Sequence, residues 1–226
     1  MEKVIIFGIG KIAEVVYYFF NQDTRYEVSG FTVDEEFLKQ KELFGLPVIS
    51  SHQVTQVYPP DSFKMFVAIG YQDMNELRSK KLKEVWKMGY QTLTYRGNSS
   101  GIPDDLDYGS NCFIMDGCHI HPRVKLGDNV FVWSGSIVGH HSEIGDNCWI
   151  TSGANIAGNV KTGINCFFAI GATLSHSISI GDYCFIGSNA LVTKDLEDNK
   201  VMIAESTKPF RLDSQQFLKL SRFSSL

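Results

Sequence analysis

Residues 124–159 read VKLGDN VFVWSG SIVGHH SEIGDN CWITSG ANIAGN, and this stretch decides the fold. Each group of six begins with a small or apolar residue and carries an apolar residue at its third position. The pattern extends without a gap from Leu106 to Asp195 and comprises fifteen hexads. The third position is apolar or aromatic in fourteen of them, and Thr162 is the exception. A register that persists over this length is the internal repeat of a solenoid fold.

A six-residue period predicts short strands separated by tight corners, with inward side chains two residues apart. Three hexads complete one triangular coil of 18 residues, so the fifteen hexads predict five coils. At about 4.8 Å per stacked strand, such a prism is about 24 Å tall. The Gly-Asp pairs at 127–128, 145–146 and 181–182 suit the corners, because Gly, Asn and Asp tolerate a positive φ.

All five cysteines occupy the first position of a hexad, which predicts small, buried packing residues. They include no Cys-x-x-Cys pair. The sequence therefore favours reduced thiols, as in the cytoplasm, over a catalytic or metal-binding role. The five are Cys112, Cys118, Cys148, Cys166 and Cys184.

The first hundred residues have a different pattern, typical of alternating strands and helices. An apolar strand at 3–7 is followed by Gly8-Ile9-Gly10-Lys11-Ile12-Ala13 and a helical run to residue 22. Further strands are expected at 26–33, 46–50 and 63–70, and an amphipathic helix at 73–88. This order predicts half of a Rossmann fold.

The Gly-x-Gly-x-x-Ala turn has the form of a phosphate cradle. Gly8 and Gly10 let the backbone approach a ligand closely, and the helix N-terminus favours negative charge. Lys11 adds a cation, and Asp34 follows the next strand, where it is placed to accept a ribose hydroxyl. The same turn also suits a purely structural role, and both interpretations stay open here. A domain of this size provides half of a dinucleotide site, which favours one nucleotide diphosphate over NAD.

Composition narrows the class of protein. The chain has 226 residues, with 21 Lys and Arg against 25 Asp and Glu, so its net charge is −4. A mildly acidic chain without a basic cluster argues against nucleic acid as a partner. No apolar run reaches the roughly 20 residues of a membrane span, and the N-terminus lacks the features of a signal peptide. We therefore expect a cytoplasmic protein with parts at residues 1–100, 101–198 and 199–226, the last a tail with a short helix.

The two halves together resemble the PglD/NeuD-like sugar acyltransferases, over about residues 2–198. The resemblance implies an α/β plus β fold: a small Rossmann-like domain followed by a left-handed parallel β-helix of about five coils. It implies that the N-terminal domain binds a nucleotide-sugar and that the β-helix binds acetyl-CoA as a co-substrate, without a metal. It also implies a homotrimer with active sites between adjacent prisms. The tail lacks the family's Gly-x-Pro-Ala-Lys ending, and Lys208 and Arg211 are its candidates for CoA phosphate contacts.

The resemblance assigns the chemistry to one corner of the β-helix. The segment SIVGHHSEIGDN, residues 136–147, matches His140 to the proposed general base of the family. Residues 18 apart stack on successive coils, so His140 lies beneath Gly158, whose N–H the family places against the thioester carbonyl. Many relatives carry a carboxylate beside the histidine, and His141 stands there in this chain. The acetyl-CoA contacts that the resemblance implies fall on Ala157, Gly158, Asn159, His176 and Lys208.

Two of the candidate residues keep a second interpretation. Trp133 points outward in its hexad, where it either stacks on a sugar or nucleobase or packs in a subunit interface. His140 is either the general base or a surface histidine at a corner.

The expected activity is acetyl-CoA-dependent N-acetylation of a nucleotide-linked amino sugar, such as a UDP- or dTDP-4-amino-4,6-dideoxyhexose, for bacterial surface glycans. Sugar O-acetylation of the sialic-acid type needs the same base and stays open. A non-catalytic trimeric nucleotide-binding scaffold is another alternative.

A zinc hydratase of the γ-carbonic anhydrase type is a further rival. Histidines 36 residues apart are typical of that class, and His140 and His176 have this spacing. Its third ligand would fall on Gly181, which has no side chain to bind zinc. Two coils should also separate the two histidines by about 10 Å, too far for one zinc ion within a chain.

Overall fold

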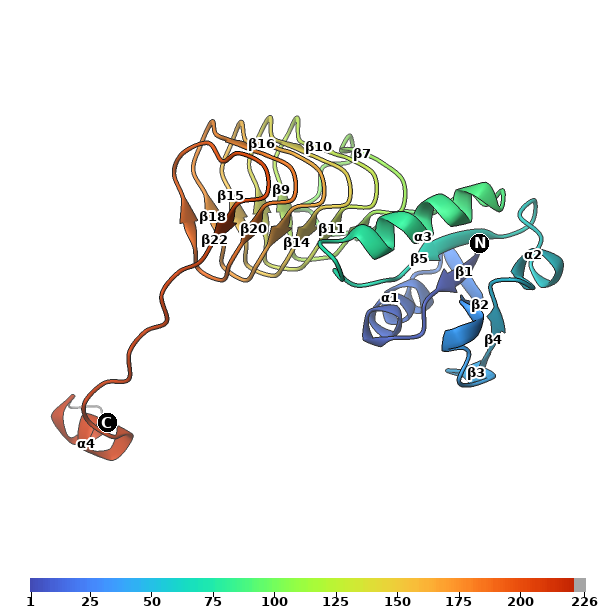
Figure 1. The fold of residues 1–226 in the computed structure, drawn as a ribbon, viewed down its shortest axis with the longest axis horizontal. Helices are drawn as coiled ribbons and strands as arrows, with labels where there is room; N and C mark the ends of the chain where they lie inside the picture. The colour runs from blue at the N-terminus through green and yellow to red at the C-terminus, as the bar shows by residue number, and fades with distance from the viewer. Residues whose placement is uncertain (222–226) are drawn as a thin grey trace.

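The computed structural model describes residues 1–221 and has two parts, a small α/β domain and a triangular prism (Figure 1). The α/β domain is built on a five-stranded sheet in the order β3-β4-β2-β1-β5. All its pairings are parallel except that of β3 with β4 at one edge. The strands are β1 (Glu2–Phe7), β2 (Tyr26–Val33), β3 (Glu42–Leu43), β4 (Leu46–Ser50) and β5 (Lys64–Val67). The helical elements are α1 (Lys11–Gln22), the 3-10 turn η1 (Glu35–Phe37), α2 (Val54–Val57) and α3 (Glu76–Lys87).

The sheet is covered on both faces, as expected for a parallel sheet. Four consecutive residues of β1, from Val4 to Phe7, are buried, because their side chains alternate between two hydrophobic clusters. One cluster holds Ile6 and includes α1 side chains, and the other holds Ile5 together with Leu82 of α3. The half-Rossmann arrangement expected from the sequence is therefore confirmed.

Two elements are shorter than the sequence pattern predicts. The helix expected at 73–88 begins at Glu76, because Asp73, Met74 and Asn75 have φ values of 50, 50 and 68°. A left-handed backbone cannot continue into a right-handed helix. The strand expected at 63–70 ends at Val67, and the chain then turns toward the prism through Tyr71.

The prism is a parallel β-helix of two-residue strands that form three sheets. The first sheet holds β7 (Asp107–Tyr108), β10 (Lys125–Leu126), β13 (Glu143–Ile144), β16 (Lys161–Thr162) and β19 (Ser179–Ile180). The second holds β6 (Tyr95–Arg96), β8 (Phe113–Ile114), β11 (Phe131–Val132), β14 (Trp149–Ile150), β17 (Phe167–Phe168), β20 (Phe185–Ile186) and β22 (Val201–Met202). The third holds β9 (His119–Ile120), β12 (Ile137–Val138), β15 (Asn155–Ile156), β18 (Thr173–Leu174) and β21 (Leu191–Val192).

Each strand pairs with the strand 18 residues away, as in the register Val138 to Ile156, so the five predicted coils are confirmed. Third-position side chains such as Ile150 fill the interior, and all five cysteines are buried there. At one corner, asparagines 18 residues apart have a positive φ and form a ladder of amide hydrogen bonds. The ladder runs from Asn111 through Asn129 and Asn147 to Asn165, with donor–acceptor distances of 2.8, 2.9 and 3.0 Å.

The α/β domain packs on the second sheet of the prism, through an outward column of aromatic side chains. Phe131 and Trp149 of this column stack with ring centroids 4.8 Å apart, and Phe66 of β5 contacts Phe131 at 5.9 Å. The two parts are continuous, since β6 already hydrogen-bonds to β8 before residue 101. The column consists of Phe113, Phe131, Trp149, Phe167 and Phe185.

Arg78 of α3 fastens this seam from inside. Its side chain is fully buried, and its guanidinium lies 4.6 Å from the ring centroid of Phe131 and 5.1 Å from that of Trp149. It donates only to neutral oxygens, which leaves a buried charge held by dipoles and aromatic faces. The acceptors are Gly70 O at 3.2 Å, Asn75 Oδ1 at 2.9 Å, Asn129 Oδ1 at 3.1 Å, Asn129 O at 3.2 Å and Asn147 O at 2.9 Å.

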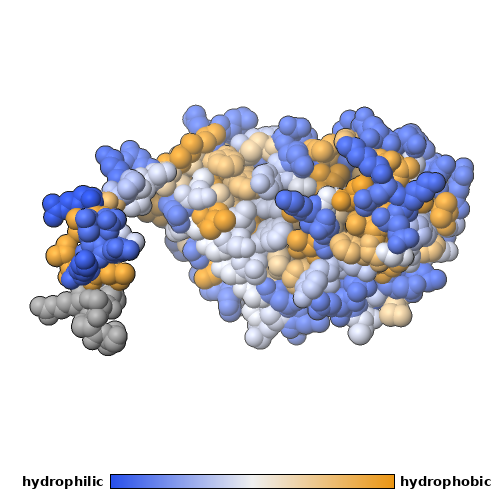
Figure 2. Space-filling model, turned by 90° about the horizontal axis from the view of Figure 1, so that it is seen from below, coloured by the Kyte–Doolittle hydropathy of each residue, from blue (hydrophilic) through white to orange (hydrophobic). Residues whose placement is uncertain are grey.

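The C-terminal segment leaves the prism after β22 and leads away from it to α4 (Ser214–Leu220) (Figure 1). Apolar side chains of this segment are exposed, among them Phe210 and Leu220, and Figure 2 shows apolar surface on it. None of the helices in the described residues has the length and apolar character that crossing a membrane requires.

Candidate functional site

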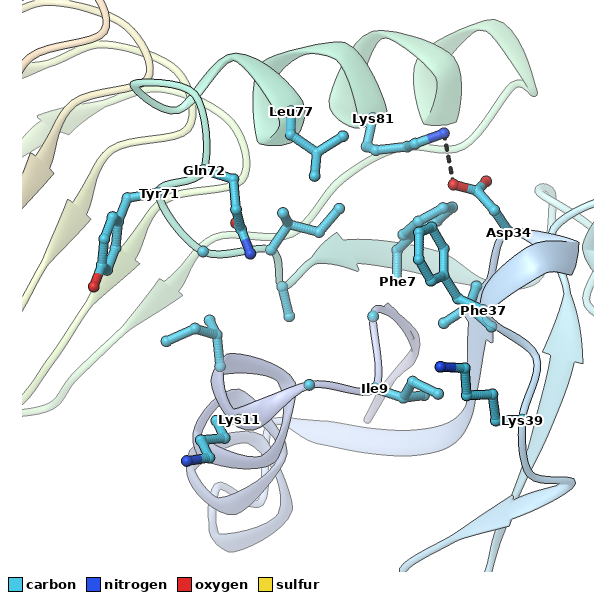
Figure 3. Close-up of a pocket in the computed structure, with 17 residues that line it drawn as sticks. Phe7, Ile9, Lys11, Asp34, Phe37, Lys39, Tyr71, Gln72, Leu77 and Lys81 are labelled. Atoms are coloured by element: carbon cyan, nitrogen blue, oxygen red, sulfur yellow. Dashed lines mark ion pairs between the residues drawn. The ribbon is translucent and has the colours of Figure 1, made fainter.

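A cavity of about 680 Å³ opens at the carboxyl ends of β1, β2 and β5 (Figure 3). Its walls come from the turn after β1, from η1, from the turn after β5 and from the start of α3. Ligands of open parallel sheets bind at this edge, where helix N-termini and loop backbones converge. Gly8, Gly10, Lys11 and Asp34, which the sequence marks as candidates, all line it.

The two glycines of the turn have different reasons to be glycine. Gly8 has a φ of 124°, and a Cβ there would lie 2.8 Å from the carbonyl oxygen of Ala68. Gly10 caps α1 with an ordinary extended backbone, and nothing lies within 4 Å of its Cβ position. The fold therefore requires Gly8, whereas at Gly10 the absence of a side chain leaves space at the helix N-terminus that a ligand can use.

Asp34 does not face the cavity alone. Its carboxylate pairs with Lys81 of α3 at 2.8 Å, as the dashed line in Figure 3 shows, and accepts a hydrogen bond from Ser51 Oγ at 3.3 Å. Lys81 also pairs with Glu84 at 2.7 Å. Burial alone would lower the pKa of Lys81, but the hydrogen bonds with Asp34 and Glu84 outweigh it, and the pKa is raised. The cavity therefore holds a fixed ion pair beside the expected ribose position.

Sequence reasoning missed the wall that follows β5. Tyr71, Gln72 and Lys81 line the cavity, and Tyr71 contacts Trp149 of the prism with ring centroids 5.4 Å apart. The signal was present in the sequence, because Gly70-Tyr71-Gln72 follows the third parallel strand and ligands collect at the ends of such strands. In Figure 3 the ammonium of Lys11 points away from Asp34, so Lys81 is the cation nearest that carboxylate among the residues drawn.

The second candidate region is the corner of the prism between the third and first sheets. His140 follows β12 and is exposed. A Cβ built on Gly158, one coil further, would lie 2.7 Å from Nε2 of His140. The imidazole therefore lies against the backbone of Gly158, and only a residue without a side chain permits this contact.

The N–H of Gly158 has no acceptor among the described residues. At the equivalent position of another hexad, Asp128 donates its backbone N–H to Oδ1 of Asp146, one coil further, at 2.8 Å. The residue one coil beyond Gly158 is His176, and its Nδ1 bonds to Ser177 Oγ at 2.7 Å. This corner thus lacks the carboxylate that occupies the N–H elsewhere, which leaves a backbone donor for a ligand.

His140 and His141 contact each other through their Nδ1 atoms, which are 3.1 Å apart, with the rings nearly perpendicular at 85°. Glu143, the nearest acidic residue in sequence, pairs with Lys161 at 3.4 Å. The ring nitrogen partner of His140 in the described chain is therefore another histidine.

The expected 10 Å between His140 and His176 is wrong, since their ring centroids are 6.2 Å apart. The register is as predicted, but Gly158 lies between them and has no side chain, so the two rings approach across it. The corner also includes Asn159, whose Nδ2 donates to Ser177 Oγ at 2.8 Å. Within residues 1–221, no group of three or more His, Cys, Asp or Glu side chains is arranged to hold a metal ion.

Three further candidates lie away from both regions. Trp133 is half-buried and packs against Trp149 at 5.6 Å, outside the cavity lining, and its buried indole N–H has no partner in the described chain. Lys208 and Arg211 are exposed in the segment that leads away from the prism. Their expected CoA contacts stay predictions.

The cavity and the histidine corner lie at different sides of the prism. The α/β domain covers the second sheet, where Phe131 is buried. His140 lies between β12 and β13, at the corner where the other two sheets meet, opposite that face. The prism therefore separates the two regions within one chain.

Comparison with known proteins matches both parts. Residues 3–85 match the PglD N-terminal domain, and residues 109–140 match the bacterial transferase hexapeptide family of six repeats. No match was found among curated proteins.

Solved structures share the complete fold. The acetyltransferase domain of PglB from Neisseria gonorrhoeae FA1090, in complex with acetyl coenzyme A, aligns with a TM-score of 0.77 and 21% identity, over 92% of this chain and 99% of that one. PerB from Caulobacter crescentus, in complex with CoA and GDP-perosamine, aligns with a TM-score of 0.77 and 22% identity, over 91% and 98%. WeeI from Acinetobacter baumannii AYE aligns with a TM-score of 0.74 and 19% identity, over 90% and 97%.

These alignments show a Rossmann-like domain joined to a left-handed parallel β-helix, as expected. In both of its parts, the chain resembles the PglD/NeuD-like sugar acyltransferases.

Proposed function

We propose that the protein transfers the acetyl group of acetyl-CoA to the amine of a nucleotide-linked amino sugar, with the product used in bacterial surface glycans. The observation that carries this proposal is the pairing of an exposed imidazole with a backbone N–H that lacks an acceptor, at His140 and Gly158. Two similar structures add support, since PglB was solved with acetyl coenzyme A and PerB with CoA and GDP-perosamine.

The nucleotide-sugar binds in the cavity of the domain formed by residues 1–100. The phosphates lie at the N-terminus of α1, over Gly8 and Gly10, where the helix dipole and free N–H groups favour negative charge. Lys11 lies on the rim, and Asp34, held by Lys81, accepts a ribose hydroxyl. The β-helix, residues 101–198, binds acetyl-CoA along the column that contains Ala157, Gly158, Asn159 and His176, with Lys208 of the tail near the CoA phosphates.

The chemical step is direct acyl transfer. Nε2 of His140 removes a proton from the sugar ammonium, and the neutral amine attacks the thioester carbonyl carbon. The carbonyl oxygen gains negative charge, and the N–H of Gly158 stabilises it; one such donor contributes about 3 kcal/mol. The carbon–sulfur bond then breaks, CoA leaves as a thiolate, and the amine's second proton passes to solvent or to the thiolate. No covalent enzyme intermediate is needed.

The active form is a homotrimer. The nucleotide cavity and His140 lie on opposite sides of one prism, so an acceptor held in one chain's cavity does not reach that chain's own histidine. A neighbouring prism solves this geometry by placing its His140 corner beside the cavity. Trp133, at the edge of the covered sheet, is then available to a sugar or to the interface.

The first test is calorimetric titration of the purified chain with acetyl-CoA, which needs no assumption about the acceptor. We expect saturable binding at about one site per chain. Acetyl transfer is then measured with a panel of UDP-, dTDP- and GDP-linked amino sugars, and with sialic acid for O-transfer. A chain that binds neither acetyl-CoA nor a longer acyl-CoA is not an acyltransferase and favours the scaffold.

The second test replaces the base. His140→Ala should lower kcat by about 100- to 10,000-fold, the range for loss of a general base, while acetyl-CoA binding and unfolding stay unchanged because the side chain is exposed. His121→Ala, at another exposed histidine of the prism, is the matched control. Unchanged turnover of His140→Ala removes this residue from the mechanism.

A further inference from the structure

The contact between His140 and His141 contains one proton. Their Nδ1 atoms are 3.1 Å apart, and the side chains meet edge to edge at 85°. A neutral imidazole has one N–H and one lone pair, so a hydrogen bond between two Nδ1 atoms requires that one ring donates and the other accepts. The direction of this bond fixes the tautomer of both rings.

Only one direction is compatible with a base at this corner. Nε2 of His140 faces Gly158, and it needs a lone pair to accept a proton from a substrate. The ring proton of His140 is then on Nδ1 and is donated to Nδ1 of His141, which carries its own proton on Nε2. The opposite direction would put a hydrogen on Nε2 of His140 and leave it unable to act as a base.

The backbone places His141 for this role. Its φ is 60°, in the left-handed region, as at Asn159 one coil further. The N–H of Asn159 donates to the carbonyl oxygen of His140 at 2.8 Å, which fixes the backbone of the pair. No carboxylate in the described residues bonds to His140, and Glu143 is paired with Lys161.

We propose that His141 is a positioning residue that holds His140 in the tautomer with a free Nε2 lone pair, through a neutral Nδ1 acceptor instead of a carboxylate. This inference rests on the proposed function. When Nε2 of His140 takes the proton from the substrate amine, its Nδ1–H continues to donate to His141, so orientation is kept through the step. The proton then leaves from Nε2 to solvent or to the CoA thiolate, and His141 neither gains nor loses one.

The left-handed backbone at 141 supplies a matched pair of variants. His141→Asn keeps an acceptor, because Oδ1 of Asn is at the same bond separation from the backbone as Nδ1 of His, and Asn tolerates a positive φ. His141→Gly also tolerates the backbone but removes the acceptor. We expect His141→Gly to lower kcat by about 10- to 100-fold, the range for a misplaced catalytic group, with the acetyl-CoA Kd within about twofold of wild type. His141→Asn should recover most of kcat.

A spectroscopic readout separates this inference from the proposed activity. ¹⁵N NMR of the full chain at about pH 8, where histidines are largely neutral, reports which ring nitrogen carries the proton. We expect His140, assigned with His140→Gln, to be protonated at Nδ1 in wild type and His141→Asn, and to shift toward the Nε2–H form in His141→Gly. Nε2 protonation of His140 in wild type, equal kcat in His141→Gly and wild type, or failure of Asn to rescue overturns the inference. If no acceptor is acetylated, the proposed function fails and the tautomer alone decides the positioning role.

Discussion

Nε2 of His140 lies 2.7 Å from the point where a Cβ on Gly158 would stand. One coil of the β-helix thus uses the missing side chain of the next as the seat for an imidazole. The same gap brings His176 to 6.2 Å from His140, although two coils separate them.

Gly158→Ala is expected to displace the imidazole with little effect on folding. The new methyl group would collide with the ring, and His140 is exposed, so the ring can rotate outward. We expect kcat to fall about 100-fold or more, since a displacement near 1 Å has that effect on a positioned group. Turnover and urea unfolding are measured together, with Asn155→Ala on the same coil as control, because that amide bonds only to the carbonyl of Gly153. Wild-type kcat in Gly158→Ala would show that the contact has no role in turnover.

The two glycines of the N-terminal turn should respond differently to substitution. Gly10→Val adds a side chain to open space, so we expect weaker nucleotide-sugar binding with acetyl-CoA binding and stability retained. Gly8→Ala forces a Cβ against the Ala68 carbonyl at a φ of 124°, so we expect a loss of about 1–3 kcal/mol in the free energy of unfolding. Calorimetric titration with each ligand and urea unfolding check both. If Gly10→Val weakens acetyl-CoA instead, the assignment of ligands to domains is reversed.

Arg78→Met should destabilise the seam between the two domains. Burial lowers the pKa of Arg78 to about 9, which still leaves it charged at neutral pH. Its removal leaves the oxygens of Gly70, Asn129 and Asn147 without a donor, and each such loss costs about 1–3 kcal/mol. We expect the free energy of unfolding to fall by about 3 kcal/mol or more in urea, followed by tryptophan fluorescence, because Trp149 lies in the seam.

The matched control is Arg25→Met, which removes a more exposed arginine paired with Asp23. Surface pairs contribute about 0–1 kcal/mol, so this change should be small. A wild-type midpoint for Arg78→Met would mean that the seam does not depend on the buried guanidinium.

The thiols of the native protein should be unreactive. All five cysteines are buried, and burial raises the pKa of Cys112 and of Cys118 to about 12. A raised pKa keeps the thiol protonated at pH 8, and the thiolate is the form that attacks a disulfide reagent. We expect negligible labelling by a chromogenic disulfide until urea unfolds the chain, and then five thiols per chain. Rapid labelling of the native protein would contradict the packing role of this column.

Repetition let the prism be predicted in detail. Thr162 is the one polar residue at the third position, yet its coil keeps the register, because neighbouring strands on both sides fix the hydrogen bonds. Each hexad repeats the same local solution, so one register assigns Cys148 inward and Trp149 outward together with every equivalent position. The phosphate-type turn was also readable, since a positive φ at Gly8 has a local cause.

Contacts between segments distant in sequence were not readable. Lys81 reaches Asp34 from another element, and Arg78 reaches Asn129 across the domain seam, because the packing of α3 and not a local pattern sets these distances. The separation of His140 and His176 was misjudged for a related reason: the register gave the spacing of the backbones, while the side chains closed it.

The sequence by itself determined the architecture, the position of the candidate base and the glycine beneath which it stacks, because periodic and local constraints act over a few residues. Tertiary structure decided what each of these groups touches. The aromatic column faces a domain and not solvent, and His141 is the hydrogen-bond partner of His140. Side-chain directions depend on packing from every neighbouring element, and no single stretch of sequence contains that information.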